Sequence, residues 1–206
     1  MSLTHSNISI FVPHIGCPNK CSFCNQRYIT GANKAPRAED VDNAVSAAIG
    51  GKAFNGKTAE IAFFGGSFTA INRAYMTDLL KAATKYVVNG TVKGIRISTR
   101  PDAIDDEILT LLKEYRVTSI ELGAQSMNDR VLRMNNRGHT SGDVVKASKL
   151  IKQYGFELGL QMMTGLYADN DASALKTAAK LIELKPATVR IYPTIVLKDT
   201  DLAALY

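Results

Sequence analysis

The chain has 206 residues, 46% of them hydrophobic and 21% charged, which is ordinary globular composition and enough for one sizeable core. No apolar run reaches the roughly 18 residues that a membrane span needs, and the N-terminus lacks the basic and apolar regions of a signal peptide. With 25 basic against 19 acidic residues the net charge is +6, which indicates a mildly basic solvated surface or, alternatively, attraction to a polyanion such as nucleic acid.

Short β-rich runs alternate with helical patterns along the chain. The expected strands are Ile8–Pro13, Glu60–Gly65, Gly94–Thr99, Ser119–Ala124, Phe156–Met163 and Thr188–Tyr192. Apolar residues at helical spacing predict helices over residues 41–49, 76–87, 104–115, 129–134, 142–154 and 175–182. Asn72 is the expected N-cap of the second helix, and Gly50 with Gly51 ends the first.

This alternation predicts an α/β fold with right-handed βαβ units and a parallel sheet. Six strands are too few for the usual eight-stranded barrel, so we expect a curved, partial TIM-type (β/α)6 barrel. A flat doubly wound sheet is the alternative, which periodicity alone does not separate. We expect one domain over residues 1–206, and we expect it to be part of a longer parent chain with a further C-terminal region.

Three cysteines, the only ones in the chain, lie within eight residues. Cys17, Cys21 and Cys24 follow the spacing C-x3-C-x2-C, with Phe23 directly before the last. An odd number of close cysteines argues against a disulfide framework and for a reducing, cytoplasmic setting. Three thiolates and no fourth suit a [4Fe–4S] cluster with one iron left open, which could bind a small molecule.

The sequence also allows other roles for these cysteines. A zinc site would need a fourth ligand, for which His14 is the nearest candidate, although its position at the end of a strand makes it awkward. A protein that only carries electrons, and thiols without any metal, are further alternatives. Phe23 is expected to pack near a cluster or a stacked base, or else in the core.

Polar and glycine residues follow each expected strand at its carboxyl end, where parallel α/β sheets bind their ligands. Gly65 and Gly66 allow close approach of a ligand to the backbone, or form a plain turn. Ser98 would face the shared mouth if its strand ends there. The remaining candidates at strand ends are Ser67, Gln125, Gln161 and Tyr192.

Charged residues near these strand ends have both functional and structural readings. Arg137 could clamp a carboxylate in bidentate fashion or be a solvated loop arginine. Arg100 and Asp102 could pair with each other, or Asp102 could cap the following helix. His139 is more often structural than functional in such a position. The amides Gln125 and Gln161 would need partners if buried, from a ligand or from the protein.

The three-cysteine pattern resembles the hallmark of the radical S-adenosylmethionine superfamily, and the resemblance covers nearly the whole chain. Phe63-Phe64-Gly65-Gly66-Ser67 resembles that family's glycine-rich motif, with Ser67 in place of the usual acid. The chain is most similar to the branch of the Elongator catalytic subunit, with oxygen-independent coproporphyrinogen oxidases as cousins. The stretches that carry this likeness are 98–102, 121–126, 136–139 and 190–194.

The resemblance implies a role for each candidate residue. The three cysteines would hold the [4Fe–4S] cluster, and S-adenosylmethionine would chelate its fourth iron. Ser98 stands where the porphyrinogen enzymes carry a ribose-binding acid, and Gln161 stands where they carry an Asp, so both positions depart from that pattern. Gly65, Gly66 and Ser67 would contact the methionine amine. The ribose and the carboxylate would be bound by Gln125, Arg137 and Gln161. Tyr192 would lie near the adenine end.

The implied activity is reductive cleavage of S-adenosylmethionine to a 5′-deoxyadenosyl radical, followed by hydrogen abstraction from a substrate. A reducing partner such as flavodoxin or ferredoxin would supply the electron, and the Elongator likeness suggests RNA, namely tRNA, as the substrate. No membrane partner is expected. The alternative is a non-catalytic [4Fe–4S] platform that binds nucleic acid or handles acetyl-CoA.

Overall fold

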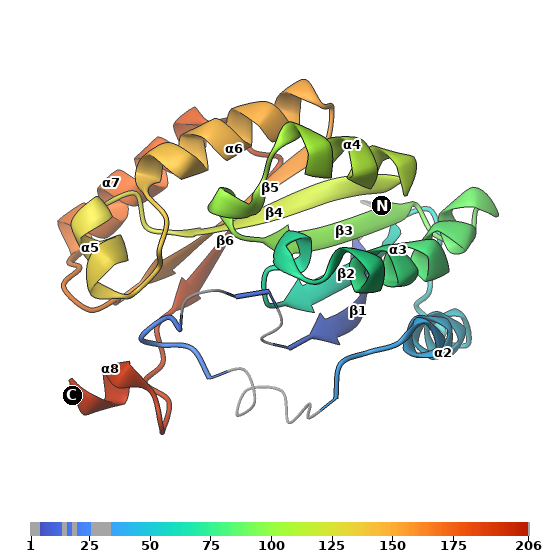
Figure 1. Cartoon of the computed structure of the whole chain (residues 1–206), viewed down its shortest axis with the longest axis horizontal. Helices are drawn as coiled ribbons and strands as arrows, with labels where there is room; N and C mark the ends of the chain where they lie inside the picture. Colours follow the sequence, from blue (N-terminus) through green and yellow to red (C-terminus); the bar gives the residue numbers. More distant parts are fainter. Residues whose placement is uncertain (1–4, 14–15, 18–19, 26–33, 206) are drawn as a thin grey trace.

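A computed structural model describes residues 5–13, 16–17, 20–25 and 34–205. Six strands in it form one sheet, and the strands lie in chain order (Figure 1). Every neighbouring pair is parallel, so all six carboxyl ends meet at one edge. The strands are β1 (Ser6–Val12), β2 (Ala59–Gly65), β3 (Gly94–Thr99), β4 (Val117–Gln125), β5 (Glu157–Thr164) and β6 (Thr188–Pro193).

The sheet curls into an open half-barrel, which confirms the expected partial barrel. The guanidinium carbon of Arg190 in β6 lies 5.1 Å from the ring centre of Phe64 in β2. Strands lie about 4.8 Å apart, so four strand spacings in a flat sheet would separate these two strands by about 19 Å. Only a sheet that curves toward itself lets their side chains meet.

Helices cover the outer face of the sheet (Figure 1). All six expected helices are present, while the two 3-10 turns and the short last helix were not predicted. The helices are α2 (Ala38–Ile49), α3 (Arg73–Val88), α4 (Asp106–Glu114), α5 (Asp129–Met134), α6 (Ser141–Gln153), α7 (Asp171–Glu183) and α8 (Asp201–Ala204), and the 3-10 turns are η1 (Phe68–Ala70) and η2 (Pro101–Ala103). None of the helices described is both long and apolar enough to cross a membrane.

Capping side chains set where the helices begin. Asn72 accepts a hydrogen bond from the backbone N–H of Tyr75 at 3.2 Å, which confirms it as the N-cap of α3. The helix expected from residue 104 begins later, because Asp105 caps it through the N–H of Ile108 at 2.7 Å. Asp102 instead pairs with Arg100, at 2.8 and 2.9 Å, so the pairing alternative holds and the capping one is wrong.

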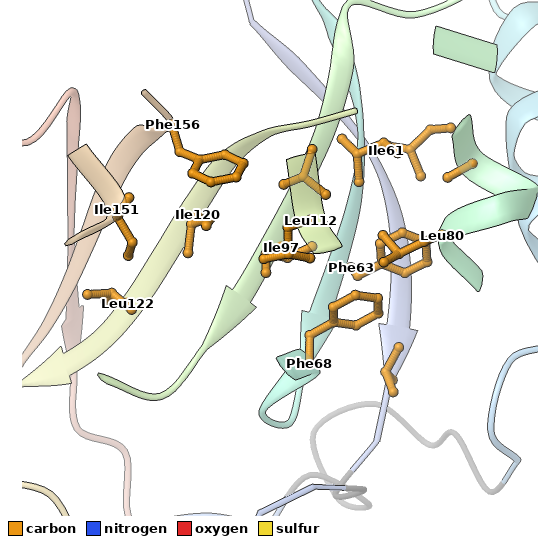
Figure 2. Close-up of a cluster of buried hydrophobic side chains, with 14 of the residues drawn as sticks. Ile61, Phe63, Phe68, Leu80, Ile97, Leu112, Ile120, Leu122, Ile151 and Phe156 are labelled. Atoms are coloured by element: carbon orange, nitrogen blue, oxygen red, sulfur yellow. The ribbon is translucent and has the colours of Figure 1, made fainter. Parts of the chain in front are cut away.

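The apolar core fills the space between the sheet and its helices (Figure 2). Alternate strand residues point outward, since side chains alternate between the two faces of a strand. They meet the apolar faces of α3, α4 and α6. The rings of Phe63 and Phe68 stack with their centres 4.7 Å apart. The fully buried residues of this layer include Ile61, Ile97, Ile120, Leu122, Leu80, Leu112 and Ile151.

Charged side chains are buried on the concave face of the half-barrel. Glu60 and Arg96, on β2 and β3, are 0% and 5% exposed and form an ion pair at 2.8 Å. The hydroxyls of Thr118 and Ser119 each donate to the same carboxylate at 2.8 Å. Burial alone would raise the pKa of Glu60, but the charge of Arg96 and these hydrogen bonds outweigh burial and lower the pKa below its ordinary value.

We expect Arg96→Met to destabilise the fold by about 3 kcal/mol, because it leaves the buried Glu60 carboxylate without its counter-charge. The double variant with Glu60→Gln should recover part of that loss. Since the folded-state pKa of Glu60 lies below 4.5, the stabilisation is present above that pH and is lost as the pH falls further. Urea unfolding at neutral pH and in acid measures both effects.

Arg73→Met is the matched control, because Arg73 pairs at 2.9 Å with Glu107 on the exposed surface. Breaking such a pair changes stability by about 1 kcal/mol or less. Equal effects of the two arginine substitutions would contradict a structural role for the buried pair.

Candidate active site at the carboxyl edge of the half-barrel

A cavity of about 640 Å³ opens at the edge where the six strands end. Its size lies within the range of roughly 300–1,000 Å³ typical of small-molecule sites. It is lined by all three cysteines and by every other site residue expected from the sequence except Ser67. These other residues are Phe23, Gly65, Gly66, Ser98, Gln125, Arg137, Gln161 and Tyr192. The structure thus brings the candidates together, while their individual roles stay predictions.

The cysteine segment follows β1 and is tied to distant parts of the chain through Ser22. The backbone and the hydroxyl of Ser22 both donate to Asn135, at 3.2 and 2.9 Å. The carbonyl of Ser22 accepts from Leu202 in α8 at 2.8 Å. Residues just after α5 and in α8 therefore hold this segment over the cavity.

The three thiols differ in exposure, and none is in a disulfide. Cys21 is 8% exposed, while Cys17 and Cys24 are half-buried. Arg137 donates from Nη1 to the sulfur of Cys21 at 3.2 Å and from Nη2 to the carbonyl of Gly123 at 2.6 Å. A guanidinium group therefore lies directly against the sulfur of Cys21.

Opposing effects act on the thiol of Cys17. Burial and the neighbouring Cys21 raise its pKa, whereas a hydrogen bond from the backbone of Ser67 and the charges of Arg100 and Arg137 lower it, and the net pKa is raised. Metal binding removes the thiol proton, so the two guanidinium groups would then stabilise the sulfur's charge.

The donor set fits an iron–sulfur cube. Among the described residues, no three His, Cys, Asp or Glu side chains converge so as to hold one metal ion. A [4Fe–4S] cube does not require such convergence, because each thiolate binds a different iron. His14, the candidate fourth ligand of a zinc site, lies outside the described residues.

The glycine-rich turn after β2 is fixed by close backbone approach. Gly65 has φ +116°, and a Cβ added there would lie 2.4 Å from the carbonyl oxygen of Val12. Only glycine fits, because the backbone of Val12 lies so close, while the approach of a ligand to Gly65 and Gly66 stays a prediction. The Ser67 side chain points away from the cavity: it is fully buried, its Oγ lies 2.9 Å from Oγ1 of Thr99, and it accepts from the backbone N–H of Arg100 at 3.3 Å. Its predicted contact with a methionine amine is untested.

Unpartnered polar atoms concentrate around the cavity. Nine buried side-chain polar atoms in the described part of the chain have no hydrogen-bond partner, and five of them belong to residues that line this cavity. Buried polar groups nearly always have partners, so a polar ligand is the simplest source of the missing ones. The five atoms are Ser98 Oγ, Arg100 Nη1, Glu121 Oε2, Gln125 Oε1 and Arg137 Nε.

The backbone of Gln125, which lines the cavity, has an unusual conformation. It has φ +62°, a conformation that residues other than glycine rarely adopt and that clusters at functional sites. The register between β4 and β5 also shifts between Gly123 and Gln125. The strand is therefore distorted where the Gln125 amide enters the cavity.

Sequence reasoning missed a charged group on the cavity wall. Glu121 of β4 is 2% exposed, and Arg190 Nε lies 3.0 Å from its Oε2 without the alignment of a hydrogen bond. Burial raises the pKa of Glu121, and the charges of Arg190 and Arg96 only partly oppose it. The available signal was alternation: outward-facing Ile120 and Leu122 flank Glu121, which therefore faces inward.

His139 is a buried structural group near the site rather than part of the cavity wall. Its Nε2 lies 3.2 Å from the carbonyl of Ala124. Burial, and next the charge of Arg137, lower its pKa from 6.5 to about 4. His139 is therefore neutral at physiological pH.

The depressed pKa of His139 predicts loss of stability in mild acid. Below pH 6.5 the His139 imidazole binds a proton in the unfolded chain, whereas in the folded chain it does not bind one until about pH 4. Stability therefore falls as the pH is lowered through that range. Between about pH 7 and pH 4.5, wild type should lose about 2–3 kcal/mol more than His139→Gln. Urea unfolding at both pH values measures the difference, and identical losses would contradict it.

A parallel half-barrel with three thiols and a ligand cavity at its carboxyl edge defines a class of cofactor-dependent domain. The sequence model of the Radical SAM superfamily matches residues 11–181, and the chain belongs to this superfamily.

Relatives place the chain more narrowly within the superfamily. An uncharacterized protein of Methanocaldococcus jannaschii is 29% identical over 201 residues, which cover 96% of this chain and 58% of that protein. A tRNA uridine(34) acetyltransferase of Dehalococcoides mccartyi is 24% identical over 228 residues, which cover 95% of this chain and 50% of that protein. The chain therefore spans between half and three fifths of the length of these relatives. It is also similar to Elongator complex protein 3 of Homo sapiens, at 29% identity over 167 residues, which cover 71% of this chain and 30% of that protein.

Solved structures confirm the fold. The archaeal Methanocaldococcus infernus Elp3 with an N-terminal deletion matches with a TM-score of 0.76 at 20% identity, over 98% of this chain and 49% of that one. Coproporphyrinogen III oxidase from Escherichia coli, a radical SAM enzyme, matches with a TM-score of 0.65 at 19% identity, over 97% of this chain and 46% of that one. Both likenesses concern the partial barrel.

Proposed function

We propose that this domain binds a [4Fe–4S] cluster through Cys17, Cys21 and Cys24 and binds S-adenosylmethionine in the adjoining cavity. It then cleaves S-adenosylmethionine reductively and abstracts a hydrogen atom from a substrate. The observation that carries the proposal is the group of five buried, unpartnered polar atoms around one cavity next to the three thiols. Membership of the Radical SAM superfamily supports it.

The bound cofactors supply the one-electron chemistry, which breaks the C5′–S bond to give methionine and a 5′-deoxyadenosyl radical. The chain's own residues bind and orient these cofactors, and they exclude water. Arg100 and Arg137 offer unpartnered N–H groups to the carboxylate of the methionine moiety. The rings of Phe11, Phe23 and Phe64 line the cavity and exclude water from the reacting atoms.

RNA, and tRNA in particular, is the proposed substrate. The relatives named as tRNA uridine(34) acetyltransferases support this, as does the net charge of +6. A small reducing protein such as flavodoxin or ferredoxin is the proposed electron donor. A reducing, cytoplasmic compartment would keep the three thiols available for the cluster.

Cys21→Ala should abolish both the cluster and the cleavage of S-adenosylmethionine, because two thiolates do not hold the cube. The protein is reconstituted anaerobically with iron and sulfide and then incubated with dithionite and S-adenosylmethionine. Iron content and 5′-deoxyadenosine are measured. The control Glu107→Gln, an exposed carboxylate on α4, should keep both. A Cys21→Ala protein that still forms 5′-deoxyadenosine would contradict the proposal.

Metal analysis separates the proposal from its rivals. Protein purified without oxygen should contain iron and acid-labile sulfide in equal amounts, approaching four of each per chain. One zinc and no iron would indicate a structural zinc site instead. A full cluster that yields no 5′-deoxyadenosine would indicate a non-catalytic platform.

A further inference from the structure

The guanidinium of Arg137 is a buried cation that no described carboxylate neutralises. Arg137 is 6% exposed, and none of the ion pairs among the described residues includes it. Arg96, by contrast, pairs with Glu60 at 2.8 Å. Arg100 pairs with Asp102, also at 2.8 Å. A buried charge without a counter-charge is costly, so the charge of Arg137 needs compensation from another group.

A cysteine sulfur is one of the two hydrogen-bond partners of this guanidinium. Nη1 of Arg137 donates to Sγ of Cys21 at 3.2 Å, and Nη2 donates to the carbonyl of Gly123 at 2.6 Å. Cys21 is also buried, with 8% of its surface exposed. Little water therefore screens the contact, and the positive charge acts on the sulfur through a medium of low dielectric constant.

The end of β4 is shaped to receive the guanidinium. The register with β5 shifts between Gly123 and Gln125, so the strand is irregular where the Gly123 carbonyl accepts from Arg137. A Cβ added at Gly123 would lie 3.1 Å from Nε2 of Gln125 and 3.4 Å from Nη2 of Arg137. A side chain at position 123 would therefore crowd both groups, and glycine leaves the space that the guanidinium occupies.

The turn after α5 holds Arg137 and the cysteine segment together. Asn136, directly before Arg137, has φ +52°, a left-handed conformation that residues other than glycine rarely adopt. Asn135 accepts from both the backbone N–H and the hydroxyl of Ser22, at 3.2 and 2.9 Å. Ser22 follows Cys21 directly in the sequence, so one turn positions both the guanidinium and the sulfur that it contacts.

This contact has a consequence for electron transfer. Hydrogen bonds to the sulfurs of an iron–sulfur cluster, together with the net charge around it, set its reduction potential. Reduction adds negative charge to the cluster, so a buried cation that donates to a ligand sulfur stabilises the reduced form more than the oxidised form. We propose that Arg137, through its hydrogen bond to the sulfur of Cys21, raises the reduction potential of the bound cluster.

The assignment rests on the proposed function, in which Cys21 is a cluster ligand. The step that it favours transfers one electron: the small reducing protein loses the electron, the cluster gains it, and no bond forms or breaks. Arg137 acts on the cluster through Nη1, while its Nε is the buried N–H group without a partner among the described residues. The contact with Cys21 therefore leaves an N–H group available to a carboxylate ligand.

Midpoint potentials of the anaerobically reconstituted cluster test the assignment. They are measured by redox titration without S-adenosylmethionine, with EPR spectra to follow the reduced cluster, so that no contact between Arg137 and a methionine carboxylate contributes. Arg137→Met should lower the equilibrium constant for reduction about tenfold, because it removes both the hydrogen bond and the charge. For a one-electron couple this is a fall of about 59 mV.

Arg137→Gln is the second variant. It keeps N–H donors but loses the charge, so its midpoint potential should lie between those of wild type and Arg137→Met. The midpoint potential is a property of each cluster, so incomplete loading of a variant does not alter it.

Lys20→Met is the matched control. Lys20 also lines the cavity and directly precedes Cys21 in the sequence, but its side chain is exposed. The substitution removes the same unit of charge beside the same cysteine. Because water and salt screen an exposed charge, the equilibrium constant for reduction should change by less than about twofold.

Three results would overturn the assignment. The potentials of both Arg137 variants equal or exceed that of wild type, or Lys20→Met lowers the potential as much as Arg137→Met, or neither Arg137 variant takes up a cluster, which would make Arg137 an assembly residue. Cluster content and formation of 5′-deoxyadenosine are measured in parallel on the wild type. If wild type has the cluster and forms the product while one of the three results is obtained, the proposed function stands and only the role of Arg137 is wrong. A wild type that forms no cluster would overturn the two together.

Discussion

The common direction of all six strands is the constraint on which the site depends. Parallel strands end at the same edge, so the segments that follow β1 to β6 meet there although they are spread along the whole chain. Curling of the sheet brings β2 and β6 closer together, as the contact between Arg190 and Phe64 shows. The cavity exists because these two features act together, and neither is a property of any single motif.

Two acid–base pairs on the concave face differ in how completely their polar atoms are hydrogen-bonded. Deep in the half-barrel, Glu60 and Arg96 satisfy each other with help from hydroxyls, so the pair stabilises the fold. Nearer the mouth, Glu121 and Arg190 are close but leave a carboxylate oxygen without a hydrogen bond. Polar groups left unsatisfied in this way destabilise the ligand-free protein and become favourable when a ligand completes their contacts.

Much of the fold could be predicted because strand and helix patterns are local. The strand Gly94–Thr99 has the bounds that the sequence indicated, and Asn72 caps its helix as expected. The role of Asp105 was missed because Asp102 offers the same chemistry three residues earlier, and only the backbone path decides between them. The short helix α8 lacks a repeating pattern, and its place depends on a distant bond to Ser22.

In the candidate site, too, local features could be predicted from the sequence, whereas contacts between distant strands could not. Cysteine and glycine positions are visible in the sequence because their spacing carries the chemistry. The contacts of Arg190 with Glu121 and Phe64 join three strands, and no local pattern reports them. The Ser67 side chain points away from the cavity because its hydroxyl meets that of Thr99, which lies on the next strand.

The central claim is that three thiolates hold an iron–sulfur cube whose fourth iron accepts S-adenosylmethionine. Mössbauer spectroscopy of protein reconstituted with ⁵⁷Fe, recorded before and after addition of S-adenosylmethionine, tests it most directly. The predicted result is a cubane spectrum in which one iron of the four changes its parameters on addition. A folded protein without a cubane, or a cubane whose four irons all stay unchanged, would contradict the claim.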